Sequence, residues 1–95
     1  MVKHIVMFKL AENTPANRRR ATEALESLRG RIETLRHLEV GEDYMALERS
    51  FDLVLITHFD DREGLSTYAG HEHHLPVVDT MRGLCSKSVS VDFEC

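Results

Sequence analysis

Tryptophan is absent from this chain of 95 residues, and cysteine and proline each occur only twice. Two cysteines, Cys85 and Cys95, cannot form a disulfide scaffold, so we expect two free thiols in a reducing compartment. No hydrophobic run approaches the ~20 residues that a membrane-spanning helix needs. The apolar stretch near the N-terminus is also too short for a secretory signal and lacks a small-residue cleavage site. The sequence therefore predicts a cytoplasmic protein with no membrane segment.

Positive charge is scarcer than negative charge. Twelve lysine and arginine residues stand against 16 aspartate and glutamate residues, which gives a formal net charge of −4. Nucleic acids and anionic membranes both require a concentrated positive surface, so neither is an expected partner. The run of three arginines at residues 18–20 has Glu23 and Glu26 nearby at helical spacing, which is typical of a solvated helix face.

The size and composition are those of one globular domain, and we predict that residues 1–95 form it. Hydrophobic residues make up 42% of the chain and charged residues 29%. A chain of this size buries only about 60–65% of its unfolded surface. An apolar sheet face that its own helices cannot cover would therefore need a partner.

Four segments alternate as strands do: residues 3–10, 35–42, 51–59 and 88–93. The first and third carry apolar side chains on both faces, which is typical of central strands covered on both sides. Three segments have helical signals. Thr14-Pro15 begins one that should end at Gly30, Asp60-Asp61 caps residues 62–69, and a third follows Pro76 over residues 77–84.

The order of these elements, β-α-β-β-α-α-β, predicts an α+β fold of the ferredoxin-like, split βαβ type with a four-stranded antiparallel sheet. Helices in this fold cover only one face of the sheet. Packing the other face against the same face of a second copy would bury its apolar side chains. We therefore expect a homodimer built on the sheet face, which gives a dimeric α/β barrel.

Several short motifs together resemble the stress-responsive dimeric α/β-barrel (Dabb) domains over nearly the whole chain. They are Val2-Lys3-His4-Ile5-Val6-Met7-Phe8-Lys9, Leu38-Glu39-Val40-Gly41, Phe51-Asp52-Leu53, the spacing of Tyr68, His71 and His74, and Val91-Asp92-Phe93. The resemblance implies a ferredoxin-like subunit that dimerises through its sheet. It leaves function open, because the family includes plant stress-associated proteins, polyketide cyclases and many bacterial members without an assigned activity.

Histidine and tyrosine are the residues best suited to chemistry here. Six histidines are a high count for this length, and His71, His73 and His74 lie within four positions. A cofactor-free cyclase or isomerase needs a base with a near-neutral pKa and a donor for a developing enolate, and histidine and tyrosine fit these roles. If the segment is helical, Tyr68, His71 and His74 share one side of it.

The resemblance to the cyclases implies that His4, Tyr68 and His74 line a catalytic pocket. We also predict Phe8, Leu53 and His71 as substrate contacts. One departure weakens the comparison. The cyclases have a functional histidine where this chain has Leu53, and by strand alternation His58 points to the opposite face. Polyketide cyclisation is therefore not the expected reaction.

Two other interpretations of the histidines remain open. They can stabilise the fold through hydrogen bonds without any chemical role. A metal site at His71, His73 and His74 lacks a His-x-x-x-His spacing and a neighbouring cysteine or acidic ligand, so we predict no metal. The absence of a glycine-rich phosphate loop also predicts no organic cofactor.

Two functions are consistent with these observations. The first is a homodimer that binds a small, partly apolar organic molecule between helices and sheet, with or without cyclase-, isomerase- or lyase-type acid-base chemistry. The second is a non-catalytic stress-associated or assembly protein with a vestigial pocket. An open cavity of ~300 Å³ or more that is lined by His4, Tyr68 and His74 would favour the first.

Overall fold

The computed structural model describes residues 1–95 and has four strands and three helices. In chain order these are β1 (Val2–Leu10), α1 (Pro15–Glu26), β2 (His37–Glu42), β3 (Leu53–Phe59), α2 (Arg62–Ala69), α3 (Leu75–Leu84) and β4 (Cys85–Glu94). The strands form one antiparallel sheet in the order β2-β3-β1-β4. This is the ferredoxin-like arrangement, so the predicted fold class is confirmed.

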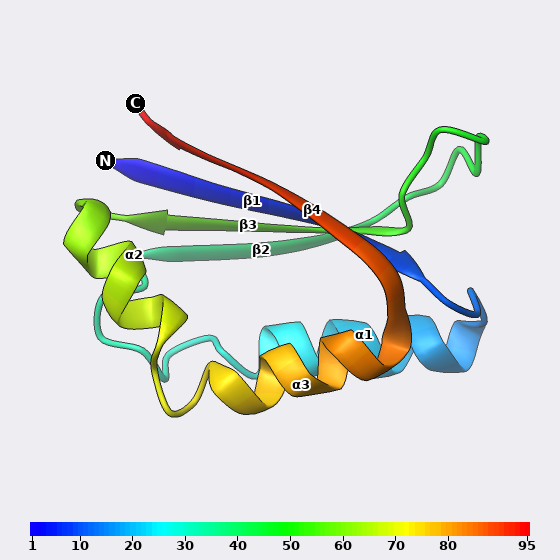
Figure 1. The fold of residues 1–95 in the computed structure, drawn as a ribbon, viewed down its shortest axis with the longest axis horizontal. Coiled ribbons are helices and arrows are strands. Elements are labelled where there is room, and N and C mark those ends of the chain that lie inside the picture. The colour runs from blue at the N-terminus through cyan, green and yellow to red at the C-terminus, as the bar shows by residue number, and fades with distance from the viewer.

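All three helices lie on the same side of the sheet (Figure 1). The alternation of strand residues decides which side chains meet them. Along β3, Leu53, Leu55, Thr57 and Phe59 are buried, whereas Val54 and Ile56 between them are only half-buried. The helix-facing side of the sheet, together with Leu25, Tyr68 and other helix residues, forms the core. None of the three helices is long and apolar enough to cross a membrane.

The opposite face of the sheet keeps apolar side chains in contact with solvent. Ile5 and Met7 of β1 lie beside Val91 and Val89 of β4 in the antiparallel register. Met7 is 41% exposed, Val91 is 62% exposed, and Phe93 further along β4 is 41% exposed. The helices thus leave an apolar sheet face uncovered, as the residue pattern predicted.

Some element boundaries differ from those predicted. Helix α1 ends at Glu26, and a turn then leads to Gly30, whose φ of 75° requires the left-handed region that glycine adopts easily. Helix α3 begins at Leu75, two residues earlier than predicted, because Pro76 fits within the first helical turn. Strand β3 begins at Leu53, two residues later than predicted, and the carboxylate of the preceding Asp52 accepts the N–H of Leu10 at 2.7 Å.

Strand β4 starts at the residue that follows α3, without an intervening loop. It is therefore three residues longer at its start than the predicted segment 88–93. This direct connection places the beginning of β4 next to the end of α3, and both border the cavity described below.

Candidate functional site

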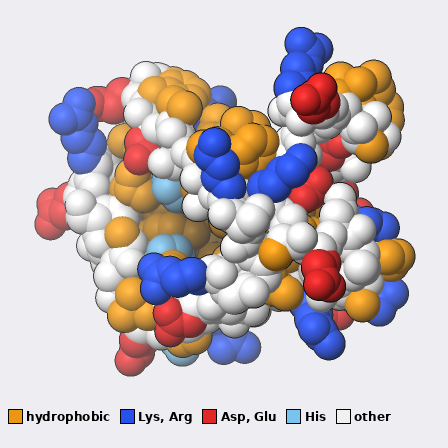
Figure 2. All heavy atoms as spheres, turned by 45° about the vertical axis from the view of Figure 1, so that its right-hand side comes forward, with side chains coloured by type: hydrophobic (Ala, Val, Ile, Leu, Met, Phe, Trp, Pro, Cys, Tyr) orange, Lys and Arg blue, Asp and Glu red, His pale blue; other side chains and the backbone are white.

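A cavity of about 390 Å³ lies between the helices and the inner face of the sheet. Ten of its 16 lining residues are hydrophobic, and they come from β1, β3, β4, all three helices and the turn after α1. The remaining residues include His4 and His74 at one end and Arg82, Lys87 and two serines at the other. Figure 2 shows this hollow, with hydrophobic and histidine surfaces inside it and basic side chains at its rim. Its size is sufficient for a small organic molecule.

His4 enters the cavity from β1 and is held by a carboxylate on the next strand. The register of the sheet pairs His4 with Asp92 of β4, and Nδ1 of His4 contacts Oδ1 of Asp92. A carboxylate accepts hydrogen bonds, so the proton of a neutral His4 is placed on Nδ1 and Nε2 is left as the acceptor. Asp92 therefore fixes both the orientation and the tautomer of His4.

Tyr68 of α2 is the most deeply buried polar side chain of the site. Its ring packs between Phe59 and His74, with centroid separations of 5.0 and 4.2 Å. The phenol oxygen is buried and has no hydrogen-bond partner in the protein. Burial raises the pKa of Tyr68, so the hydroxyl stays protonated and able to donate. A buried donor without a partner is costly, which makes it a plain candidate for contact with a bound molecule.

His74 stands just before α3 and faces Tyr68. Its Nδ1 lies 3.0 Å from the carbonyl oxygen of Ala69, and because a carbonyl can only accept, Nδ1 carries the proton. Burial lowers the pKa of His74, and the nearby His4 and His71 act in the same direction. A neutral imidazole with a free Nε2 results, which is the form that can accept a proton near pH 7.

These three side chains lie together around one end of the cavity. The rings of His4 and Tyr68 meet edge-on with centroids 6.0 Å apart, and Tyr68 stacks obliquely on His74. All three border the same cavity. Two imidazoles and one phenol thus offer proton acceptors and a proton donor beside an apolar space. Groups of this kind can remove a proton from a carbon acid and stabilise the enolate that forms.

The three predicted substrate contacts have different positions. Phe8 lines the cavity. Leu53 does not, because it packs inside the core with 2% of its surface exposed. His71 also lies elsewhere: α2 ends at Ala69, the chain turns, and Nε2 of His71 contacts Oε2 of Glu33 at 3.2 Å. The cavity therefore brings together His4, Phe8, Tyr68 and His74 but not Leu53 or His71.

The histidines of the turn do not form a metal cluster. Nδ1 of His71 accepts the backbone N–H of His73 at 3.1 Å, and its other nitrogen faces Glu33, so both nitrogens of His71 are occupied. No group of three or more histidine, cysteine, aspartate or glutamate side chains is arranged to hold a metal ion. Cys85 borders the cavity, but burial and the charge of Asp52 raise its pKa and so disfavour a reactive thiolate.

Sequence reasoning missed two charged residues of the site. Asp92 was noted only as part of a strand motif. A single acid between Val91 and Phe93 in the last strand could, however, have indicated a polar partner for it on a neighbouring strand. Arg82 follows His74 at an interval of eight residues, which places both on one side of a helix that includes them. The sequence predicted a helix that begins at residue 77, so His74 was not considered together with Arg82.

The sequence profile of the Stress responsive A/B Barrel Domain matches residues 2–95. The chain belongs to this family. A stress-response A/B barrel domain-containing protein of Arabidopsis thaliana is 27% identical over 94 residues, which cover 96% of this chain and 83% of that protein. The resemblance noted from the sequence motifs is thereby confirmed.

Solved structures show the same fold in other members and relatives. A dimeric protein of unknown function with a ferredoxin-like fold from Bacteroides fragilis is 28% identical, with a TM-score of 0.85 and coverage of 99% of this chain and 95% of that chain. A hydroxynitrile lyase from Passiflora edulis is 13% identical, with a TM-score of 0.83 and coverage of 97% and 90%. At that identity the likeness to the lyase concerns the fold alone.

Proposed function

We propose that this A/B barrel protein is a homodimer that binds a small, partly apolar organic molecule in the cavity. We further propose that His4, Tyr68 and His74 carry out cofactor-independent proton transfer on that molecule. The observation that carries the proposal is the hydroxyl of Tyr68, a residue that lines the cavity: this hydroxyl is buried and has no hydrogen-bond partner within the protein.

The walls of the cavity support binding of an apolar body. Val77 and Met81 of α3 face Leu55 of β3 across it, and Leu25 of α1 and Leu28 of the following turn close it. Burying an apolar molecule against such walls is favourable by about 25 cal/mol per Å² of apolar surface removed from water. At about 390 Å³ the cavity exceeds the size of ~300 Å³ that we expect to favour ligand binding over a vestigial pocket.

The polar end supports proton transfer rather than packing alone. A substrate with a carbonyl group beside a C–H bond could place its oxygen against the Tyr68 hydroxyl. Nε2 of His74 would then accept the proton from carbon while Tyr68 donates a hydrogen bond to the enolate oxygen. His4, oriented by Asp92, provides a second imidazole, which meets the Tyr68 ring edge-on.

The uncovered sheet face supports the dimer. Ile5, Met7, Val91 and Phe93 leave an apolar surface on the side away from the helices. The Bacteroides fragilis relative, with 28% identity, is described as dimeric. A second copy placed on this face would bury it and close a barrel of two sheets.

The binding test uses phenylbutyramide, a neutral aromatic probe, and NMR titration of the labelled protein. We expect the backbone signals of Val77 and Met81 to shift in the wild type and to stay unchanged in His74→Ala. His73→Ala is the matched control, because His73 is exposed and does not line the cavity. Light scattering on the same samples should give twice the chain mass of 10.9 kDa.

The proton-transfer test uses phenylbutanone, whose hydrogens beside the carbonyl exchange slowly in deuterated water. A positioned base contributes about 10²–10⁴-fold to such a step. We expect the wild type to accelerate the exchange and both His74→Ala and Tyr68→Phe to lose most of this acceleration. Binding of the amide without exchange of the ketone would reduce the function to non-catalytic binding. If neither probe affects the cavity signals, the proposal is rejected for small aromatic ligands.

A further inference from the structure

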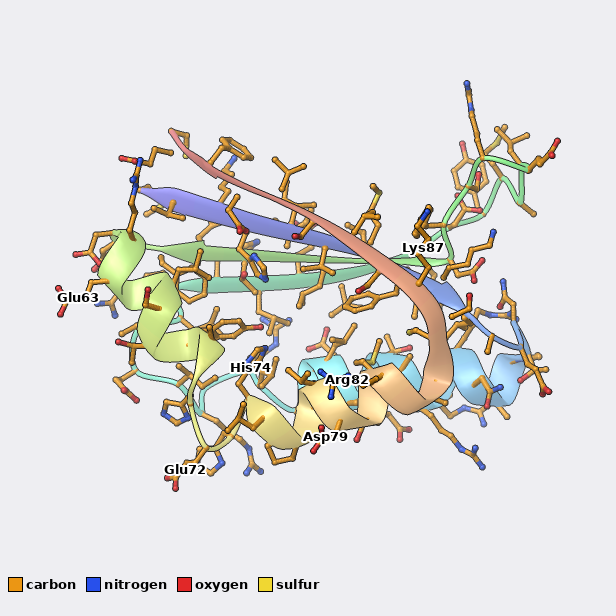
Figure 3. All side chains as sticks on the ribbon, in the orientation of Figure 1. Glu63, Glu72, His74, Asp79, Arg82 and Lys87 are labelled. Atoms are coloured by element: carbon orange, nitrogen blue, oxygen red, sulfur yellow. The ribbon has the colours of Figure 1, made fainter.

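Arg82 is the one permanent charge on the cavity side of α3. His74, Val78 and Arg82 follow one another at intervals of four residues, so they share one side of the helix, and all three line the cavity. Figure 3 shows Arg82 on the side of α3 that faces the sheet and Asp79 on the side that faces solvent. This row of three residues therefore begins with the neutral imidazole of His74 and ends with the guanidinium of Arg82.

No aspartate or glutamate lines the cavity. The labelled acids, Glu63 of α2, Asp79 of α3 and Glu72 of the turn between them, all project outward (Figure 3). Asp79 approaches Arg82 at 3.7 Å, but both side chains are more than three-quarters exposed, so this pair is weak. The guanidinium of Arg82 thus keeps most of its capacity to bind an anion at the mouth of the cavity, which is the end lined by Arg82, Lys87 and two serines.

The facing wall of the mouth is strand β4. Ser88 is paired with Phe8, whose side chain lines the cavity, so its hydroxyl lies on the cavity side of the sheet. Lys87 also borders the mouth, but its partner in the register is Lys9, and strand alternation directs its side chain toward the other face. Ser86 also borders the mouth, but its hydroxyl donates to the carbonyl of Lys9 at 3.4 Å. Arg82 and Ser88 are therefore the groups best placed to contact an anion directly, with Lys87 adding to the local field.

We propose that the natural ligand is an amphipathic carboxylate, bound through its carboxylate group by Arg82 at the mouth and by its apolar body along the cavity. This assignment rests on the proposed function, since it names the class of molecule that the same cavity takes. Eight residues of helix separate His74 from Arg82, a rise of ~12 Å. A ligand that reaches both must be elongated, with its reactive carbon remote from its charge.

The balance of charge selects a carboxylate over a phosphate. One guanidinium matches one negative charge, and its planar fork fits the two oxygens of a carboxylate. A phosphate group would require more donors, and here α3 presents its C-terminal end, where the helix dipole is negative. Arg82 also compensates that dipole as the basic residue of the last turn. The test must therefore separate binding from helix stability.

The test compares phenylbutyrate with phenylbutyramide, which differ in charge but hardly in shape, by NMR titration at low ionic strength. We expect the wild type to bind the acid about tenfold more tightly than the amide, as charge-assisted hydrogen bonds do. Arg82→Gln should abolish this preference by weakening the acid far more than the amide, while Arg82→Lys should keep part of it. Arg19→Gln is the control, because Arg19 is an exposed arginine of α1 that does not line the cavity.

The outcomes separate this inference from the proposed function. Equal binding of acid and amide in the wild type, with His74→Ala abolishing both, would overturn the carboxylate assignment and leave the cavity as a ligand site. Equal weakening of both probes in Arg82→Gln, together with a lower unfolding midpoint, would show a purely structural arginine and also overturn it. If neither probe binds in any variant, the proposed function and the carboxylate assignment fail together.

Discussion

Replacing Tyr68 with phenylalanine removes one oxygen atom and leaves the ring contacts with Phe59 and His74 in place. That oxygen is buried and has no hydrogen-bond partner in the protein. Burying a hydroxyl without a partner costs about 1–3 kcal/mol in protein mutational data. We therefore expect Tyr68→Phe to raise the free energy of unfolding by about 1–2 kcal/mol, against the usual direction of core substitutions.

The measurement is thermal unfolding followed by calorimetry, supported by urea titration. In a domain of 60–100 residues, each kcal/mol corresponds to a change in Tm of about 4–8 °C. Wild type and variant must be compared at one protein concentration, because dimerisation makes Tm depend on it. The same variant should bind or process ligands less well, so stability and function should change in opposite directions.

A loss of stability in Tyr68→Phe would refute the reasoning. It would mean that the hydroxyl is hydrogen-bonded in the folded protein, for example to an ordered water molecule in the cavity. The free donor on which the proposed function rests would then not exist. Tyr44→Phe is a suitable control, because Tyr44 is 90% exposed and its hydroxyl is already in contact with water.

Three further predictions concern the dimer, the histidines and metal. Val91→Lys places a charge on the uncovered sheet face and should convert the dimer to a folded monomer in light scattering. Ser66→Lys on α2 is the control and should leave the mass unchanged. A Val91→Lys protein that is still dimeric would exclude this face as the dimer interface. Burial lowers the pKa of His74 below the 6.5 of an unperturbed histidine, so the unfolded state takes up the proton first and stability is lost as the pH falls below that value. In urea titrations between about pH 7.5 and 5, His74→Asn should therefore lose less stability than the wild type. The same pH dependence of stability in both proteins would contradict the lowered pKa of His74. Chelators should leave the unfolding midpoint unchanged, and a decrease that zinc reverses would reveal a metal site at His71 and His73.

The order of elements could be predicted from the sequence because each strand and helix has a strong local signal. Alternation along residues 3–10 and 51–59 identified the two central strands, and the Thr14-Pro15 and Asp60-Asp61 caps placed two helix starts. The boundaries were less predictable where tertiary contacts decide them. Just before β3, for example, the hydrogen bond between Asp52 and Leu10 joins residues far apart in the chain.

The site was predictable only where the motif itself fixes the geometry. Tyr68 and His74 meet because the chain turns between α2 and α3, and the resemblance to the Dabb domains suggested their partner on β1. His71 was expected beside Tyr68 and His74 on the condition that the turn between the helices is itself helical, whereas the turn after Ala69 directs it toward Glu33. Asp92 required the register between β1 and β4, which no local pattern contains.

Strand β4 borders the cavity on one face and the surface proposed for dimerisation on the other, and this arrangement can link ligand binding to dimerisation. Asp92 on one face holds His4 at the cavity, while Val91 and Phe93 on the other face belong to the surface proposed for dimerisation. A ligand that displaces α3 would pull directly on the start of β4, because no loop separates them. Ligand affinity and subunit affinity would then be coupled, and by linkage each would change the other by the same factor.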